Sequence, residues 1–333
     1  MMRHSGRCHG RRLCYGPRAV TEPDVSVPTE SPSSRASAPV SDAARARRTG
    51  LTYLGIAALS YGGLWPAMRL GAGYMPPIWF AVVRLLIGSA FLFSVLAVTG
   101  RLRRPQRADC LVILSVGLLM MGLFVVLVHY ALQFVPAGRG ALLGYSTPLW
   151  VTPFAVLFQG EKLTRWKLAG LVLGLSGLAI LFNPTAFDWT DRKVLAGNFM
   201  LLLAALGWSV AILHMRVHKW NLSPLQLGPW QLLVATAVAL PAAIWLEPRH
   251  DVVWGAPLFA LIGYAGVIGT GIAMFAATSA IRLTGPVTAS IGLLGGPVVA
   301  LTLSVLFLGE PPTLTLLGGL VLILSGIALV SVP

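Results

Sequence analysis

Long apolar runs recur along the chain from Leu51 onward, separated by short gaps that contain polar, glycine and proline residues. Each run has about 18 to 25 residues, enough for a helix to cross the roughly 30 Å hydrocarbon core of a bilayer. Backbone groups inside such a core must be hydrogen-bonded internally, so the runs predict helices. The ten predicted segments are 51–70, 78–99, 109–134, 138–158, 166–182, 195–215, 224–246, 255–281, 286–308 and 313–332.

Residues 1–50 have a different pattern, rich in Arg, Pro, Ser and Ala and poor in large apolar side chains. Such a segment cannot bury enough apolar surface to offset the entropy of ordering, so we expect a disordered basic tail.

Composition supports a membrane protein, because 56% of residues are apolar and only 11% are charged, against about 25% charged in globular proteins. The formal net charge of +14 would favour nucleic-acid binding in a soluble protein. Here the cations lie mainly in the tail and in short connections between apolar runs, so we expect a lipid bilayer and no nucleic acid as partner.

The distribution of Lys and Arg predicts the orientation. With the tail inside, the inner connections hold ten of these cations and the outer connections five. Cytoplasmic loops carry the excess of positive charge. We therefore expect a multi-pass protein of the cytoplasmic membrane with both termini in the cytoplasm.

An internal repeat divides the apolar region. When Pro148–Leu181 is aligned with Pro297–Val330, 16 of 34 positions are identical, including Gly160-Glu161 with Gly309-Glu310. The earlier helices match as well, with Met68-Arg69 on Met215-Arg216. Two halves of five helices follow, 51–182 and 183–333.

An odd number of helices places the second half in the membrane upside down relative to the first. The sequence thus predicts an all-α integral membrane protein whose ten transmembrane helices form two inverted five-helix repeats, an architecture common among secondary transporters.

Several motifs carry a family resemblance: Ala-Leu-Ser-Tyr-Gly-Gly at 58–63, Pro-Pro followed by Arg84, and a proline, Gly-Glu and glycine-rich pattern that appears twice. The chain resembles the EamA-type branch of the drug/metabolite transporter superfamily over about residues 51–332. The resemblance implies a ten-helix carrier with a central cavity between its halves, which exports amino acids, other metabolites or drugs.

Arg84 is the cation that we place inside a predicted helix, about a third of the way through the core. Ala81 and Gly88 share its helix face and are small, as expected where another helix or a cavity comes close. We predict that Arg84 attracts a carboxylate or other anionic group of the substrate. A structural hydrogen bond to nearby carbonyls stays open as the alternative.

Four aromatic residues are candidate substrate contacts. Tyr61 and Trp65 lie four positions apart and share a helix face, and Trp208 is the repeat counterpart of Tyr61. Tyr145 completes the set. Trp and Tyr in membrane proteins usually form belts at the membrane–water interface. That position does not apply to Tyr61 and Trp208, because they lie near the middle of their helices.

Pro148 and Pro297 lie at matching places about ten residues into their predicted helices, where proline removes a backbone hydrogen bond and bends the helix. Their pairing favours a role in cavity shape or gating, although prolines are also tolerated in membrane helices. Glu161 and Glu310 are interpreted as parts of structural turns, because each follows a glycine at a helix end and precedes a threonine suited to cap the next helix.

The function predicted on these grounds is a secondary transporter, and specifically an exporter, of small metabolites such as amino acids or of drug-like molecules, working by alternating access around a midplane cavity. No paired acids, metal cluster, cofactor motif or activated nucleophile indicates an enzyme. A non-transporting membrane scaffold and a carrier for nucleotide-sugar-like anions stay open, as does a homodimer. A cavity lined by Arg84, Tyr61 and Trp208 would favour a carrier over a scaffold.

Overall fold

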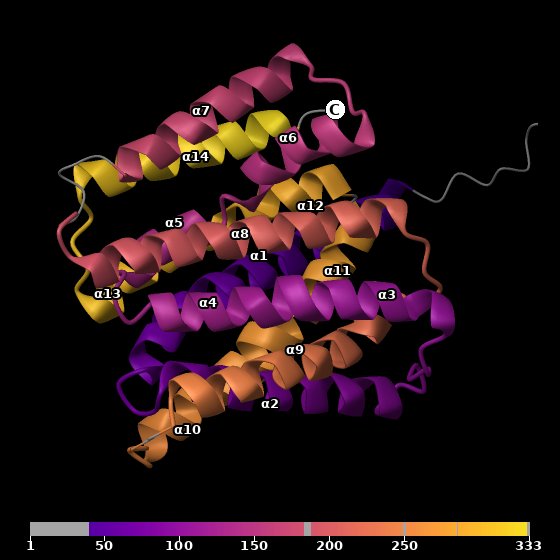
Figure 1. Ribbon diagram of the computed structural model, residues 1–333. Coiled ribbons are helices and arrows are strands. Elements are labelled where there is room, and N and C mark those ends of the chain that lie inside the picture. Colours follow the sequence, from indigo (N-terminus) through magenta and orange to yellow (C-terminus); the bar gives the residue numbers. More distant parts are fainter. Residues whose placement is uncertain (1–39, 183–187, 249–250, 285, 332–333) are drawn as a thin grey trace, which may run out of the picture. The chain divides into compact units, whose positions relative to one another are not determined.

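The computed structural model describes residues 40–182, 188–248, 251–284 and 286–331, and all regular structure within these ranges is helical (Figure 1). The first half of the chain forms five helical segments, two of which are built from several pieces. They are α1 (Val40–Gly71), α2 (Pro77–Val98), α3 (Arg107–Ser115) continued by the π-helix η2 (Val116–Leu123) and α4 (Phe124–Ala131), α5 (Ala137–Gly144) followed by α6 (Thr147–Gln159), and α7 (Arg165–Leu181).

The second half forms five segments of the same kinds in the same order. They are α8 (Arg192–Val217), α9 (Pro224–Leu246), α10 (Ala256–Gly263) continued by the π-helix η3 (Tyr264–Ile272) and α11 (Ala273–Thr284), α12 (Pro286–Leu293) followed by α13 (Gly295–Leu308), and α14 (Leu314–Val330). The all-helical fold with ten segments agrees with the pattern of apolar runs.

The first helix begins earlier than predicted, at Val40. Residues 40–50, assigned to the tail, are therefore helical. Their alanines and arginines are good helix formers, and the hydroxyl groups of Thr49 and Thr52 donate to carbonyls one turn back. The rest of the predicted tail lies outside the described residues.

Six of the helical segments are long and apolar enough to cross a membrane by length and composition. They are Pro77–Val98, Arg107–Ala131, Ala137–Gln159, Arg192–Val217, Pro224–Leu246 and Ala256–Thr284. Gly295–Leu308 and Leu314–Val330 are apolar but shorter. α7 opens with Arg165 and Lys167, which lowers its mean hydropathy, and α1 contains many small and polar residues.

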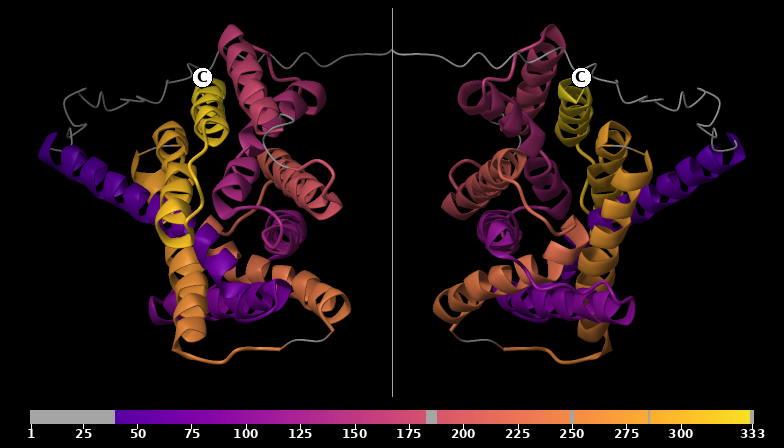
Figure 2. Two further views of the ribbon diagram at one scale, coloured as in Figure 1. Left: turned by 90° about the vertical axis from the view of Figure 1, so that its left-hand side faces the viewer. Right: turned by 90° about the vertical axis from the view of Figure 1, so that its right-hand side faces the viewer.

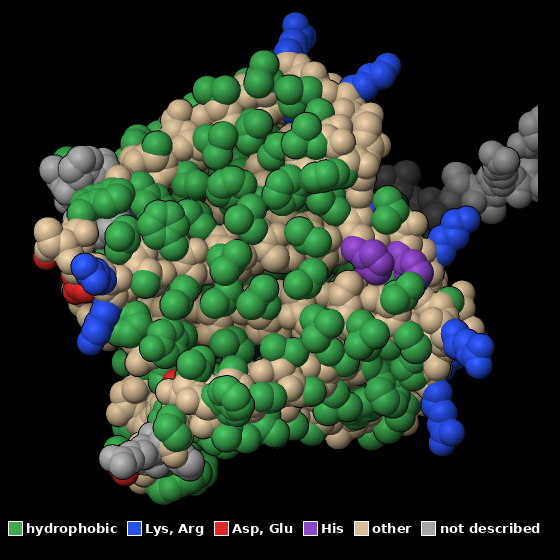
Figure 3. Space-filling model, in the orientation of Figure 1, with side chains coloured by type: hydrophobic (Ala, Val, Ile, Leu, Met, Phe, Trp, Pro, Cys, Tyr) green, Lys and Arg blue, Asp and Glu red, His purple; other side chains and the backbone are tan. Residues whose placement is uncertain are grey.

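Hydrophobic side chains cover the face of the bundle seen in Figure 3, while Lys and Arg side chains lie along its left, right and upper edges. The α6–α7 loop lies at the right-hand end of Figure 1 and the α13–α14 loop at the left-hand end. We call these the Glu161 end and the Glu310 end, after the acidic residue in each loop.

The two halves pack through equivalent helices. α2 contacts both α9 and η3, α9 contacts η2, α5 contacts α13, and α7 lies against α14. Figure 2, which looks along the bundle from its two ends, shows α7 and α14 side by side. Small residues permit this approach, because a Cβ atom added to Gly170 would lie 2.6 Å from the carbonyl oxygen of Gly326.

Each half contains a π-helical stretch in its third segment. The pattern of apolar residues predicts α-helix at these positions. Within η3, the Thr270 hydroxyl donates to the carbonyl of Ala265, five residues back, at 2.8 Å. Glycines let both stretches approach their neighbours, since an added Cβ at Gly117 would lie 2.6 Å from Val234 Cβ on α9. π-Helical turns frequently occur at functional sites, and these two border the cavity described below.

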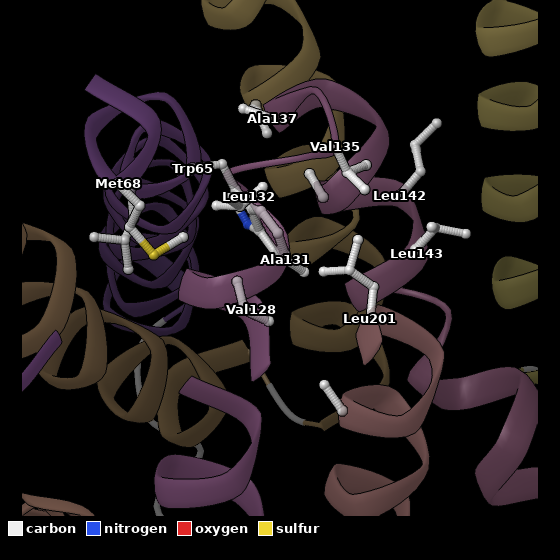
Figure 4. Close-up of a cluster of buried hydrophobic side chains, with 14 of the residues drawn as sticks. Trp65, Met68, Val128, Ala131, Leu132, Val135, Ala137, Leu142, Leu143 and Leu201 are labelled. Carbon is white, nitrogen blue, oxygen red and sulfur yellow. The ribbon is translucent and has the colours of Figure 1, made fainter. Parts of the chain in front are cut away.

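A buried apolar cluster fills the bundle around the α4–α5 turn (Figure 4). Trp65 of α1 reaches this turn, where Gly140 and Gly144 of α5 leave room for its ring: an added Cβ at Gly144 would lie 2.7 Å from the indole. Met68, one turn further along α1, is also buried in the cluster. The bundle is thus solidly packed near the Glu310 end.

Candidate functional site

A cavity of about 1160 Å³ lies between the two halves. It extends from the Glu161 end, where Glu161, Lys167 and Arg216 line it, to a deep part bordered by buried residues. Its volume is slightly above the roughly 300–1,000 Å³ that ligand pockets commonly measure, so it has room for a small organic molecule. Within its lining, the polar and aromatic side chains deep in the bundle are Tyr61, Trp65, Arg84, Phe124, His129, Tyr145, Thr147, Thr152, Trp208, Gln231 and Thr270.

The structure brings the predicted substrate contacts together. All five, which are Tyr61, Trp65, Arg84, Tyr145 and Trp208, line this one cavity although they come from four helical segments. Pro148 lines it too. Pro297 is buried in α13 and is not part of the lining.

Arg84 lies deep in the cavity wall and is 5% exposed. Its Nε donates to Nε2 of His129 at 3.2 Å, and its Nη1 donates to the hydroxyl of Thr270 at 2.9 Å. Among the described residues it forms no ion pair with a carboxylate. A buried guanidinium has five N–H donors, so Arg84 retains donor capacity for an anionic group in the cavity.

His129 orients Arg84 from α4. Its Nδ1 lies 2.8 Å from the carbonyl oxygen of Val125, an acceptor that requires a proton on Nδ1. Nε2 is then left with its lone pair and can accept from Arg84 only in the neutral ring. We assign this tautomer from the two contacts. No local sequence pattern indicates this partnership, because the two residues are 45 positions apart in the chain.

Gln231 of α9 occupies the repeat position that matches Arg84 of α2, and it lines the same cavity at 5% exposure. Its side-chain amide makes no hydrogen bond within the part of the chain that the structure describes. The two matched positions therefore offer one cation and one neutral amide to a single space, and the cavity is polar at both.

Aromatic rings form much of the remaining wall. The Trp65 and Tyr145 ring centroids are 6.1 Å apart, and Trp208 meets Phe124 edge to face at 4.6 Å. Such pairs are worth about 0.5–1.5 kcal/mol beyond the area that they bury. The rings give the cavity a rigid apolar surface beside Arg84.

A break interrupts the helix shortly before each of the paired prolines. Tyr145 and Ser146 separate α5 from α6, and Leu294 separates α12 from α13. Proline cannot bond the carbonyl four residues back. Before Pro148, the hydroxyl of Thr147 donates to that carbonyl, on Gly144, at 3.0 Å.

Two acidic side chains hold the Glu310 end closed. The Glu310 carboxylate accepts from the backbone N–H of Ala137 at 2.6 Å and of Gly138 at 2.9 Å, the first residues of α5. Glu247, after α9, accepts from Ile78 at 3.0 Å at the start of α2. Both contacts join one half to the other, and no local sequence pattern predicts them. The interpretation of Glu310 as part of a structural turn was therefore incomplete.

At the Glu161 end the matching acid has other partners. Glu161 accepts from Lys167 Nζ at 2.9 Å and from Arg216 Nη1 at 2.7 Å. The hydrogen bond from Lys167, together with the two positive charges, lowers the pKa of the Glu161 carboxyl, against a smaller opposing effect of partial burial.

Arg139 is one of the five cations that the sequence analysis counts in the outer connections, and this placement is wrong. It lies within α5 and is 7% exposed. Its Nε donates to Asn198 Oδ1 at 2.8 Å, and a terminal amino group donates to the carbonyl of Leu181. The guanidinium also lies over the Phe182 ring. These contacts tie α5 to α7 and α8.

Within the described ranges, no three His, Cys, Asp or Glu residues come close enough to hold a metal ion. The deep part of the cavity lining offers the cation Arg84, neutral hydrogen-bonding groups and aromatic rings. That set suits binding and orientation of a small molecule.

The chain is similar in sequence to several bacterial transporters. The chain is 28% identical to YoaV of Bacillus subtilis, an uncharacterized transporter, over 269 residues, covering 81% of this chain and 92% of that protein. It is 26% identical to a protein of Streptantibioticus cattleyicolor named a probable terminal-alkyne amino-acid exporter, covering 82% and 90%. The inner membrane transporter YedA of Escherichia coli K12 is also 26% identical, covering 75% and 80%.

A solved crystal structure shares the fold, with a TM-score of 0.57 at 23% identity, covering 87% of this chain and 96% of the other. The sequence profile of the EamA-like transporter family matches twice, over residues 48–183 and 195–332, once in each half. The chain is therefore a multi-pass membrane protein and a member of the EamA-like transporter family, within the drug/metabolite transporter superfamily.

Proposed function

We propose that this protein is a secondary transporter that exports small metabolites with an anionic or zwitterionic group, such as amino acids, or drug-like molecules of that kind. The observation that carries the proposal is the cavity of about 1160 Å³ with buried Arg84 in its deep part. A charge buried without a carboxylate partner is costly, and an incoming anion would supply one.

The substrate's carboxylate or other anion would take up the free donors of Arg84. A guanidinium binds a carboxylate through two parallel hydrogen bonds. His129 and Thr270 leave it oriented for this, because they occupy Nε and one donor of Nη1. The apolar part of the substrate would contact the rings of Tyr61, Tyr145 and Trp208.

Alternating access would follow from two inverted five-helix repeats that rock around this site. The matched α6–α7 and α13–α14 loops at opposite ends of the bundle support the inversion. With both termini in the cytoplasm, the Glu161 end faces inward and the cavity is loaded from the cytoplasm. The outward direction is supported by the amino-acid exporter among the relatives.

A non-transporting scaffold is the second candidate, and a hollow centre counts against it. A protein that only held partners in the membrane would gain stability by filling such a space with side chains. A carrier for nucleotide-sugar-like anions would need several cations for the phosphates, and in the deep part of the cavity Arg84 is the cation that the lining offers.

The test is release from proteoliposomes. Vesicles containing the purified full chain are loaded with a metabolite extract, and the released compounds are measured by mass spectrometry. Selective, saturable release of carboxylate-bearing compounds is expected. Release equal to that of protein-free vesicles for every compound would contradict the carrier and favour the scaffold.

A further inference from the structure

Glu161 and Glu310 occupy two loops of the same conformation. Gly160 and Gly309, which end α6 and α13, both have φ 66° and ψ 22°, a left-handed conformation suited to glycine. The Glu161 N–H donates to the carbonyl of Ala155 at 3.2 Å, and the Glu310 N–H donates to that of Ser304 at 3.4 Å. The two carboxylates thus start from equivalent backbone.

Their partners nevertheless differ. At the Glu310 end the carboxylate caps the first turn of α5, in the other half of the protein. At the Glu161 end the carboxylate binds Arg216, which ends the first helix of the other half. Arg69 is the repeat counterpart of Arg216, and its guanidinium donates to the carbonyl of Leu132 rather than to Glu310. One repeat contact is therefore realised in two alternative ways.

The partner missing at the Glu161 end is present in the chain. Extending the register of Pro148 and Pro297 toward the N-terminus matches the start of α5 with the start of α12, at Pro286. Proline has no N–H, so the first backbone donors of that turn belong to Val287 and Thr288. Val287 is the repeat equivalent of Gly138, whose N–H Glu310 accepts, and Thr288 supplies the next N–H of the same turn.

We propose that Glu161 and Glu310 exchange these two roles during transport: at the closed end the glutamate caps the fourth segment of the opposite half, and at the open end it binds the arginine of that half's first segment. This exchange rests on the proposed transport function. In the structure Glu310 is the cap and Glu161 is the arginine partner. In the alternate state Glu161 caps α12 and Glu310 binds Arg69.

The glutamate carboxylate has a favourable electrostatic partner in both states. A helix N-terminus offers free N–H groups and the positive end of the helix dipole, so a carboxylate is favourable there. When the same carboxylate leaves, an arginine on a neighbouring helix takes it up and no bare charge remains. Because each cap joins the two halves, forming it draws one end of the cavity together and breaking it lets that end open.

Variants of the two glutamates test the exchange through distances between spin labels. In a full chain with its three cysteines replaced by serine, one pair at the Glu310 end is Gln133→Cys with Leu314→Cys. The other pair, at the Glu161 end, is Leu163→Cys with Arg282→Cys, where Arg282 matches Gln133 in the repeat. Each pair places one label on each half. Double electron–electron resonance in lipid nanodiscs then reports the opening of each end.

Glu310→Ala should lengthen the distance at the Glu310 end and shorten it at the Glu161 end. Glu161→Ala should do neither, since it removes the cap that the alternate state requires and leaves the observed state populated. Asp191→Ala is the matched control: Asp191 also accepts two backbone N–H groups at a helix start, but within its own half, and its removal should change neither distance.

Unchanged distances in Glu310→Ala, or the same opening in Glu161→Ala, would overturn the exchange. These readouts do not require a substrate. Opposite behaviour of the two variants in a protein that releases no compound from proteoliposomes would uphold the exchange and contradict the carrier. Release that is normal in both variants, with distances unchanged, would uphold the carrier and contradict the exchange.

Discussion

Arg84 Nε lies 3.2 Å from Nε2 of His129, and this contact joins the second and third helical segments of the first half at the wall of the central cavity. The histidine must be neutral to accept from the guanidinium. The pair therefore presents a single positive charge to the cavity. The hydrogen bond from His129 to the Val125 carbonyl holds the imidazole ring in the orientation that accepts from Arg84.

Replacing His129 by Leu should weaken transport about two- to tenfold, because Arg84 loses an acceptor worth roughly 0.5–1.5 kcal/mol. His129→Gln, which retains an acceptor, should recover part of the rate. His214→Leu is the matched control, since His214 contacts Ser115 at 2.8 Å and lies outside the cavity lining. Initial rates of efflux from proteoliposomes measure the effect, and equal rates for His129→Leu and the unaltered protein would contradict it.

The paired prolines should matter for transport more than for insertion. Pro148→Ala allows the missing backbone hydrogen bond to form and the break before α6 to close, which would narrow the cavity that Pro148 lines. We expect normal membrane levels and reduced efflux for Pro148→Ala and Pro297→Ala, measured by quantitative blotting and transport in the same cells. A double variant that transports at the full rate would show that the prolines are only tolerated.

Close packing of α7 on α14 gives a stability prediction. A Cβ atom at Gly326 would lie 2.6 Å from the carbonyl oxygen of Gly170, so Gly326→Leu must push the two helices apart at a cost of about 1–3 kcal/mol. Gly318→Leu on the same helix is the control, because no atom lies within 4 Å of its added Cβ. Only Gly326→Leu should lower the midpoint temperature of thermal unfolding in detergent. A decrease of the same size for Gly318→Leu would refute the packing explanation.

The inverted repeat predicts opposite sides for Lys162 and Leu314, which lie in matched loops. Leu314 is 88% exposed, so a cysteine there should react with a membrane-impermeant maleimide in intact cells. A cysteine at position 162 should react only in inverted membrane vesicles. Labelling of both positions from the same side would exclude the inversion.

Periodicity and repeats predicted the ten helical segments, and the spacing of Tyr61 and Trp65 predicted a shared face because four residues make about one helical turn. The five residues predicted to contact substrate line one cavity, and their contact with a substrate stays a prediction. Two kinds of feature were beyond the sequence. The π-helical stretches η2 and η3 leave the pattern of apolar residues unchanged, so the sequence pattern does not predict them.

Long-range polar partners were the other kind. Nothing near Glu310 indicates that its carboxylate would cap α5, since Ala137 lies far away in the chain. Arg139 reads as a loop cation by its position, and its burial follows only from Asn198 and the helix ends that surround it. Contacts of this sort depend on how whole helices pack, which single-sequence patterns do not encode.

Transport by Arg84 variants is the measurement that tests the account most directly. In proteoliposomes loaded with a released carboxylate compound and a neutral analogue, Arg84→Gln should lower efflux of the carboxylate compound about tenfold or more, as expected for losing a charged hydrogen-bonding partner. Arg84→Lys should restore part of it, and the neutral analogue should be little affected. Efflux of the carboxylate compound at the unaltered rate in well-folded Arg84→Gln would contradict the account.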